Sequence, residues 1–96
     1  MTLYFFGRFH ARPGAEDGLK AAILQVLRPS REEAGCIGIH AFRSRKDSAL
    51  FFIHSQWIDE AAFDLHASLA HTVRFIEAAQ PLLDQPLETT RTTLIG

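Results

Sequence analysis

Apolar and polar side chains alternate at the start of the chain, where residues 3–12 read LYFFGRFHAR. Leu3 and Phe9 fall on one side of an extended segment and Arg8 on the other, because successive side chains of a strand point to opposite faces. This period of two predicts a first strand over residues 3–12. A Pro-Gly pair, which is typical of a turn, follows the strand.

A helical period replaces the alternation in the next segment. Leucine, isoleucine and valine recur at helical spacing between residues 19 and 27, which predicts a helix of about four turns. Pro29 is expected to end or kink this helix, because proline has no backbone N–H to donate. Ser30 and Glu33 have the spacing of a capping box for a short extra turn, and Gly35 is expected to close that turn.

The rest of the chain completes a recognisable order of elements. Residues 36–45 and 49–57 both resemble strands, and the polar stretch RKDS between them suits a hairpin loop. Asp59 is expected to cap a second helical region over residues 60–83, and the threonine-rich residues 87–95 return as a final strand. The order β-α-β-β-α-β with right-handed crossovers predicts an α+β, ferredoxin-like fold, in which a four-stranded antiparallel sheet carries both helices on one face.

The second helical region does not fit one straight helix. At about 100° per residue, Phe63 and Ala67 would lie on one side, whereas Phe75 and Ala79 would lie on the opposite side. One straight helix cannot bury both sets. We therefore predict a break near residues 68–71, with Ser68 as the N-cap of the second piece.

Both faces of the third strand are apolar. Phe51 and Ile53 point to one face and Phe52 to the other, where Phe6 and Phe42 are expected to join it. Two helices can cover only one face of the sheet. We therefore predict a homodimer, in which two sheets pack face to face as a barrel-like core with the helices outside.

The composition is that of one folded domain over residues 1–96. Of the 96 residues, 47% are hydrophobic and 22% charged, which is enough to bury one core but not two. A net charge of -1 provides no basic field for nucleic acid. No apolar run approaches the roughly 20 residues of a membrane-spanning helix, and no secretion signal is evident. We expect a cytoplasmic protein without a nucleic-acid or membrane partner.

Two aromatic residues near the second helical region have useful chemistry. Trp57 ends its strand just before Asp59, and His66 follows nine positions later. With an ordinary pKa near 6.5, His66 is the best general base of the chain for work near neutral pH. His71 and Phe75 lie four residues apart and should share one helical side. Taken singly, Trp57 and His66 are more typical of a packed core than of a reaction site, whereas the His71 and Phe75 pair is as typical of core packing as of a pocket lining.

Metal and nucleophile chemistry are not predicted. His10, His40 and His54 come from three strands, but they form no close ligand pair and no carboxylate accompanies them. Cys36 is the only cysteine, so it can form neither an internal disulfide nor a cysteine-based metal cage. No serine lies in a nucleophile elbow, and phosphate-binding loops are absent.

Three stretches resemble the antibiotic biosynthesis monooxygenase domain, namely RPGAEDGLKAAI, SREEAGCIGIHAFRS and FFIHSQWIDEAAFDLHASLAHTVRF. The resemblance covers nearly the whole chain and is closest to small bacterial proteins described as quinol monooxygenases. It implies a dimeric α+β barrel whose oxygenases work without flavin, haem or metal. In the implied mechanism a base deprotonates a phenol or quinol, and the anion passes an electron to O₂. The implied partners are a small aromatic substrate, O₂ and a second copy of the chain, with no cofactor.

The resemblance also implies roles for single residues. Trp57 would donate to the substrate ring or clamp it, and His66 would be the base or the partner of the developing oxyanion. The residues expected to line the substrate cleft are Phe63, His71, Phe75 and Ser55.

Two departures from the family pattern leave alternatives open. Many relatives carry a glutamate two residues before the tryptophan, where this chain has Ser55, so the base would have to be His66 or His71. The first strand lacks the asparagine of the haem-degrading relatives, which argues against haem cleavage. The alternatives to a monooxygenase are a non-catalytic small-molecule binding or stress-response module, and an isomerase that uses His66 as its base.

Overall fold

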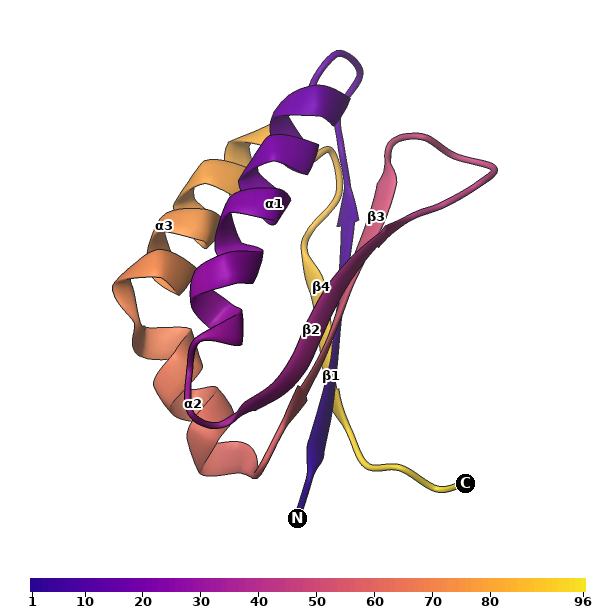
Figure 1. Cartoon of the computed structure of the whole chain (residues 1–96). Helices are drawn as coiled ribbons and strands as arrows, with labels where there is room; N and C mark the ends of the chain where they lie inside the picture. Colours follow the sequence, from indigo (N-terminus) through magenta and orange to yellow (C-terminus); the bar gives the residue numbers. More distant parts are fainter.

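Eight secondary-structure elements build one sheet with helices on a single side. They are β1 (Leu3–His10), α1 (Glu16–Arg31), β2 (Cys36–Arg43), β3 (Leu50–Trp57), α2 (Glu60–Ser68), α3 (Ala70–Ala79), the short 3-10 helix η1 (Gln80–Leu82) and β4 (Glu88–Thr92). The computed structural model describes all residues from 1 to 96. The four strands are antiparallel in the order β2-β3-β1-β4, and the helices cover one face of the sheet (Figure 1). The predicted ferredoxin-like α+β fold is confirmed.

None of the helices combines the length and apolar character that crossing a membrane requires.

Of the two effects expected of Pro29, an end of the helix does not occur, because α1 continues to Arg31. Pro29 lies in the last turn, where the missing N–H leaves only one helical hydrogen bond unmade. The predicted capping box is also wrong, because the Ser30 hydroxyl donates back to the Val26 carbonyl at 2.7 Å and caps nothing. Glu33 is thereby free to make other contacts.

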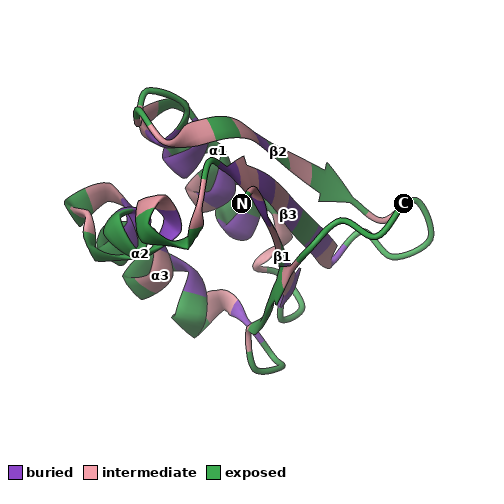
Figure 2. Cartoon of the chain, turned by 90° about the horizontal axis from the view of Figure 1, so that it is seen from below, coloured by how far each residue is buried: buried purple, intermediate pink, exposed green.

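The core lies between α1 and the helix-facing side of the sheet (Figure 2). Leu19, Ile23 and Val26 of α1 are each at most 4% exposed, at the helical spacing that the sequence predicts. They pack with Phe9 of β1 and Ile53 of β3 in one buried cluster. Burying an aliphatic or aromatic side chain contributes roughly 1.5–3 kcal/mol, so this cluster is the main source of stability.

The opposite face of the sheet remains apolar and uncovered. Phe6, Phe42 and Phe52 are 47%, 53% and 36% exposed, as the alternation of the strands predicts. Phe42 and Phe52 are register partners on β2 and β3, and Phe6 lies against the ring of His54 with 4.7 Å between the centroids. No helix lies on this side (Figure 1).

The predicted break in the second helical region is confirmed. Leu69 separates α2 from α3 with an extended backbone, at ψ 150°. Ser68 is not the N-cap, because its hydroxyl donates to the Leu65 carbonyl and Leu69 takes the cap position. The change of direction lets Phe63 and Phe75 both point inward, and both are 8% exposed.

The final strand is shorter than the predicted residues 87–95. Strand β4 pairs only with β1, from Arg8↔Glu88 to Tyr4↔Thr92. Pairing stops at Thr92 although the threonine-rich sequence continues, so β-propensity alone does not decide where the strand ends.

Gly35, in the connection from α1 to β2, packs directly against α2. A Cβ added at this position would overlap the Cβ of Ala62. Both carbons are fixed to the backbone, so neither can rotate away, and Gly35→Ala is expected to lower the free energy of unfolding by about 1–3 kcal/mol. The matched control is Gly38→Ala, where the nearest heavy atom lies at 3.7 Å. Urea unfolding followed by circular dichroism measures both, and equal stabilities of the two variants would contradict this packing.

Candidate active site

A cavity of about 170 Å³ lies between the sheet and the helices. Ten of its 14 lining residues are hydrophobic, and the polar ones are Ser55, His66, Thr72 and Thr89. Four of the six predicted site residues meet there, namely Ser55, Phe63, His66 and Phe75. Trp57 and His71 do not line this cavity. The site is therefore an apolar chamber with a few polar groups, which is the usual composition of a small-molecule site.

His66 presents one ring nitrogen to a carboxylate and keeps the other free. Its Nδ1 lies 2.7 Å from Oε2 of Glu33, and the Thr72 hydroxyl lies 3.3 Å from the same nitrogen. An ionised carboxylate only accepts hydrogen bonds, so Nδ1 carries the proton. In the neutral ring Nε2 then has a lone pair, and it has no hydrogen-bond partner in the protein. His66 lines the cavity, and Nε2 is its ring nitrogen that has no partner within the protein.

Burial and charge act in opposite directions on His66. Removal of the ring from water lowers its pKa below the ordinary value, while the hydrogen bond and the negative charge of Glu33 raise it. Burial is the larger effect, so the net pKa is lowered. The ring is therefore neutral near pH 7, which is the protonation state of a general base.

Glu33 also holds a second histidine. The same Oε2 that accepts from His66 lies 2.8 Å from Nε2 of His71. The carboxylate thus fixes two imidazoles from α2 and α3 against the connection between α1 and β2. Sequence reasoning missed this role of Glu33 because its partners lie 33 and 38 positions away, where no local spacing reveals them.

Trp57 does not take the predicted position over a substrate. It is fully buried at 0% exposure, and its indole N–H donates to the Ser55 hydroxyl at 2.9 Å. Its ring lies against His66, with 4.4 Å between the centroids, and Trp57 is not among the residues that line the cavity. The Ser55 oxygen is an acceptor in this bond, so its own hydrogen remains available to the cavity. Trp57 therefore positions His66 and Ser55 without reaching the cavity itself.

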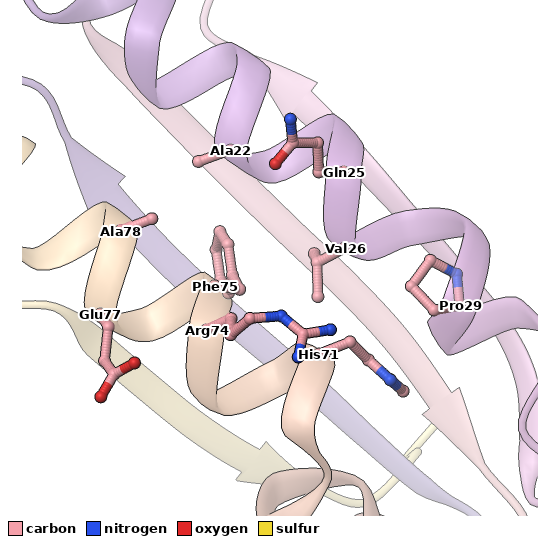
Figure 3. Close-up of a pocket in the computed structure, with 9 residues that line it drawn as sticks. All are labelled: Ala22, Gln25, Val26, Pro29, His71, Arg74, Phe75, Glu77 and Ala78. Atoms are coloured by element: carbon pink, nitrogen blue, oxygen red, sulfur yellow. The ribbon is translucent and has the colours of Figure 1, made fainter.

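His71 was expected to line the substrate cleft and instead lies in a separate groove between α1 and α3 (Figure 3). Val26 and Phe75 border both this groove and the cavity. Phe75 also meets Phe9 edge to face, with 5.6 Å between the ring centroids. Val26 and Phe75 therefore form the wall between the solvent-facing groove and the cavity.

The three strand histidines do not form a cluster. His10 lies between two carboxylates, with Nε2 at 2.9 Å from Asp47 and Nδ1 at 2.7 Å from Asp84, and these bonds raise its pKa. His54 lies on the uncovered face of the sheet against Phe6. The group that does converge is Glu33, His66 and His71, whose potential ligand atoms all lie within 4.8 Å of one another.

Comparison with known proteins agrees with this architecture. A model of the family described as antibiotic biosynthesis monooxygenase matches residues 3–78. The chain belongs to this family. The match to the antibiotic biosynthesis monooxygenase family includes Glu33, His66 and His71, and it ends before Leu87 and Thr89 of the cavity wall.

Solved structures share the fold over almost the full chain. Rv0793 from Mycobacterium tuberculosis has a TM-score of 0.95 at 22% identity, covering 100% of this chain and 97% of that one. PA3566 from Pseudomonas aeruginosa has a TM-score of 0.91 at 29% identity, covering 99% and 95%. A structure described as an antibiotic biosynthesis monooxygenase has a TM-score of 0.92 at 21% identity, covering 98% and 99%.

A curated relative is the uncharacterised protein sll1783 of Synechocystis sp., which is 27% identical over 82 residues. The matched segment is 85% of this chain and 56% of that protein. The chain therefore spans little more than half the length of this relative.

Proposed function

We propose that this member of the family is a cofactor-independent monooxygenase that oxidises a small aromatic quinol or phenol with O₂. The observation that carries the proposal is the free Nε2 of a buried, neutral His66, which belongs to the wall of an apolar cavity and whose other nitrogen is held by Glu33. A base needs this combination of an available lone pair and a fixed tautomer to take a proton from a hydroxyl group.

The volume of the cavity limits the substrate to about one aromatic ring. An engineered protein cavity of about 150 Å³ accommodates benzene, and this cavity of about 170 Å³ is similar in size. The aromatic walls formed by Phe63 and Phe75 suit a flat ring. A fused polycyclic substrate would require these walls to move.

The polar groups of the cavity support deprotonation of a ring hydroxyl. Nε2 of His66 would take the proton, and the Ser55 hydroxyl would donate a hydrogen bond to the oxyanion that forms. The electron-rich anion then reduces O₂ directly. For a quinol, one oxygen atom enters the ring and the other leaves as water, so the products are a hydroxyquinone and H₂O. All four electrons come from the substrate.

An oxygen electrode tests this function. Single-ring quinols and phenols are added to the chain after treatment with a chelator, and the expected result is saturable uptake of one O₂ per quinol, with a hydroxylated product identified by mass spectrometry. Absence of uptake alongside tight binding of the same compounds would favour a binding module. Product formation without O₂ would favour an isomerase.

The uncovered face supports the proposal that two copies pair through their sheets. Phe6, Phe42 and Phe52 form an apolar patch of a kind that an isolated sheet rarely leaves in water. Phe52→Lys is expected to shift a dimer to a monomer at micromolar concentration, because a buried unpaired charge costs several kcal/mol. Light scattering after size-exclusion chromatography measures the mass. Leu65→Lys on α2, where the side chain is 61% exposed, is the matched control and should leave the mass unchanged.

A further inference from the structure

The group formed by Glu33, His66 and His71 has a chemical capacity beyond general base catalysis. Two imidazole nitrogens and one carboxylate oxygen lie within 4.8 Å of one another, and they come from three different segments of the fold. We propose that these three side chains bind a divalent transition-metal ion of the zinc class, and that the bound ion switches off the base. The first part stands alone, whereas the second rests on the proposed function.

The distances fit a metal after a small adjustment. Zinc binds imidazole nitrogen and carboxylate oxygen at about 2.0–2.2 Å, which places tetrahedral ligands roughly 3.3–3.5 Å apart. The carboxylate of Glu33 now lies 2.7 Å and 2.8 Å from the two ring nitrogens. It must therefore retreat by about half an ångström, and the two ring nitrogens, which lie within 4.8 Å of each other, must approach to about 3.4 Å. Rotation of the glutamate and imidazole side chains allows both movements. Three protein ligands leave the fourth position of the ion to water.

The donor set and its surroundings determine which ions fit. Two imidazoles with one carboxylate suit Zn²⁺ and its neighbours in the first transition row, whereas Mg²⁺ prefers oxygen ligands. The side chains of Glu33, His66 and His71 are 11%, 9% and 20% exposed, so their interaction with an ion is little weakened by water. His71 borders the groove between α1 and α3, and this groove provides the route for entry (Figure 3).

A metal at this position would change which ring nitrogen of His66 carries the proton. The ion binds Nδ1, which now carries the proton of the neutral ring. That proton must move to Nε2, so the ring gains no proton and loses none. Nε2 then carries a proton where it previously had a free lone pair, so it can no longer deprotonate a substrate. Occupation of the metal site and action of His66 as a base therefore exclude each other.

Isothermal titration of the untagged, chelator-treated chain with ZnCl₂ tests the site directly. We expect one ion per chain, and MgCl₂ is expected to give no binding. Loss of a partner even outside the ligand shell weakens metal sites by about 10–100-fold, so Glu33→Gln and His71→Gln should each weaken binding by about 100-fold or more. Circular dichroism verifies that both variants remain folded.

The matched control removes two of the three histidines outside the proposed site and keeps His10, which is held by Asp47 and Asp84. His40 and His54 are register partners on β2 and β3, and the double variant His40→Gln, His54→Gln should keep the wild-type affinity. Binding that survives in Glu33→Gln and His71→Gln, or that disappears in the His40, His54 variant, would overturn the proposed site.

Nitrogen-15 NMR of the histidine rings tests the switch without using activity. Nε2 of His66 is expected to have the shift of an unprotonated nitrogen in the metal-free chain and that of a protonated nitrogen with zinc. Zinc binding without this change would overturn the switch while leaving the site intact. Absence of O₂ uptake would refute the proposed function, but it would affect neither the titration nor the NMR result.

Discussion

Replacing His66 with glutamine is expected to lower kcat/KM for O₂-dependent oxidation of a single-ring quinol by about 10²–10⁴-fold, which is the usual contribution of general base catalysis. Glutamine occupies a similar volume and can still hydrogen-bond to Glu33, but its amide takes up no proton near pH 7. The cavity is otherwise unchanged, so KM should change less than kcat. Initial rates from the oxygen electrode provide both constants.

His54→Gln is the control for this substitution. His54 lies on the uncovered face of the sheet, away from the cavity, and its replacement should leave kcat/KM within about two-fold. A loss of less than ten-fold in folded His66→Gln would rule out His66 as the base. The nearest alternative among the chain's histidines, His71, would then have to reach the substrate from the groove.

Trp57→Ala is expected to be the most destabilising substitution in the site, with a loss of about 3–5 kcal/mol in the free energy of unfolding. The side chain is completely buried and packs against both His66 and Phe63. Removing it leaves a cavity and deprives the Ser55 oxygen of the indole N–H. In a domain of this size, 1 kcal/mol corresponds to about 4–8 °C, so thermal unfolding should begin at least 12 °C lower.

The next residue in the chain provides a matched control. Ile58 is 53% exposed, and Ile58→Ala should change the stability by less than about 0.5 kcal/mol. Trp57→Phe keeps an aromatic ring but removes the N–H, so the difference between Trp57→Phe and Trp57→Ala separates packing from the hydrogen bond to Ser55. A Trp57→Ala chain as stable as the Ile58→Ala chain would contradict the structural role assigned to the indole.

Periodicity was sufficient to predict the layers of the fold. Alternation along β3 correctly divided Phe51 and Ile53 from Phe52, because the two faces of a strand are fixed by its geometry. The opposing apolar sides of residues 60–83 correctly required a break, which the structure places at Leu69. These patterns are local or nearly so, and burial of one face is the dominant contribution to folding energy.

The polar contacts of the site were not predictable in the same way. Ser30 and Glu33 have the spacing of a capping box, yet Ser30 bonds to Val26 and Glu33 reaches two histidines on other elements. The N–H of Trp57 could have faced a substrate as readily as Ser55, and only tertiary packing decides between them. Hydrogen bonds between distant segments depend on angles and distances that residue spacing does not encode.

The central position of β1 has a consequence for biosynthesis. This strand pairs with β3 and β4, so β1 leaves the ribosome before either partner and must wait for segments from the second half of the chain. About 50 residues separate Leu3 from its partner Trp57, and at about 5–20 residues per second the wait is roughly 3–10 s. Throughout that interval β1 has no strand partner and exposes Phe5, Phe6 and Phe9. An unpaired apolar strand can pair with other chains, and such pairing leads to aggregation. We therefore expect the chain to be most prone to aggregation while it is being translated.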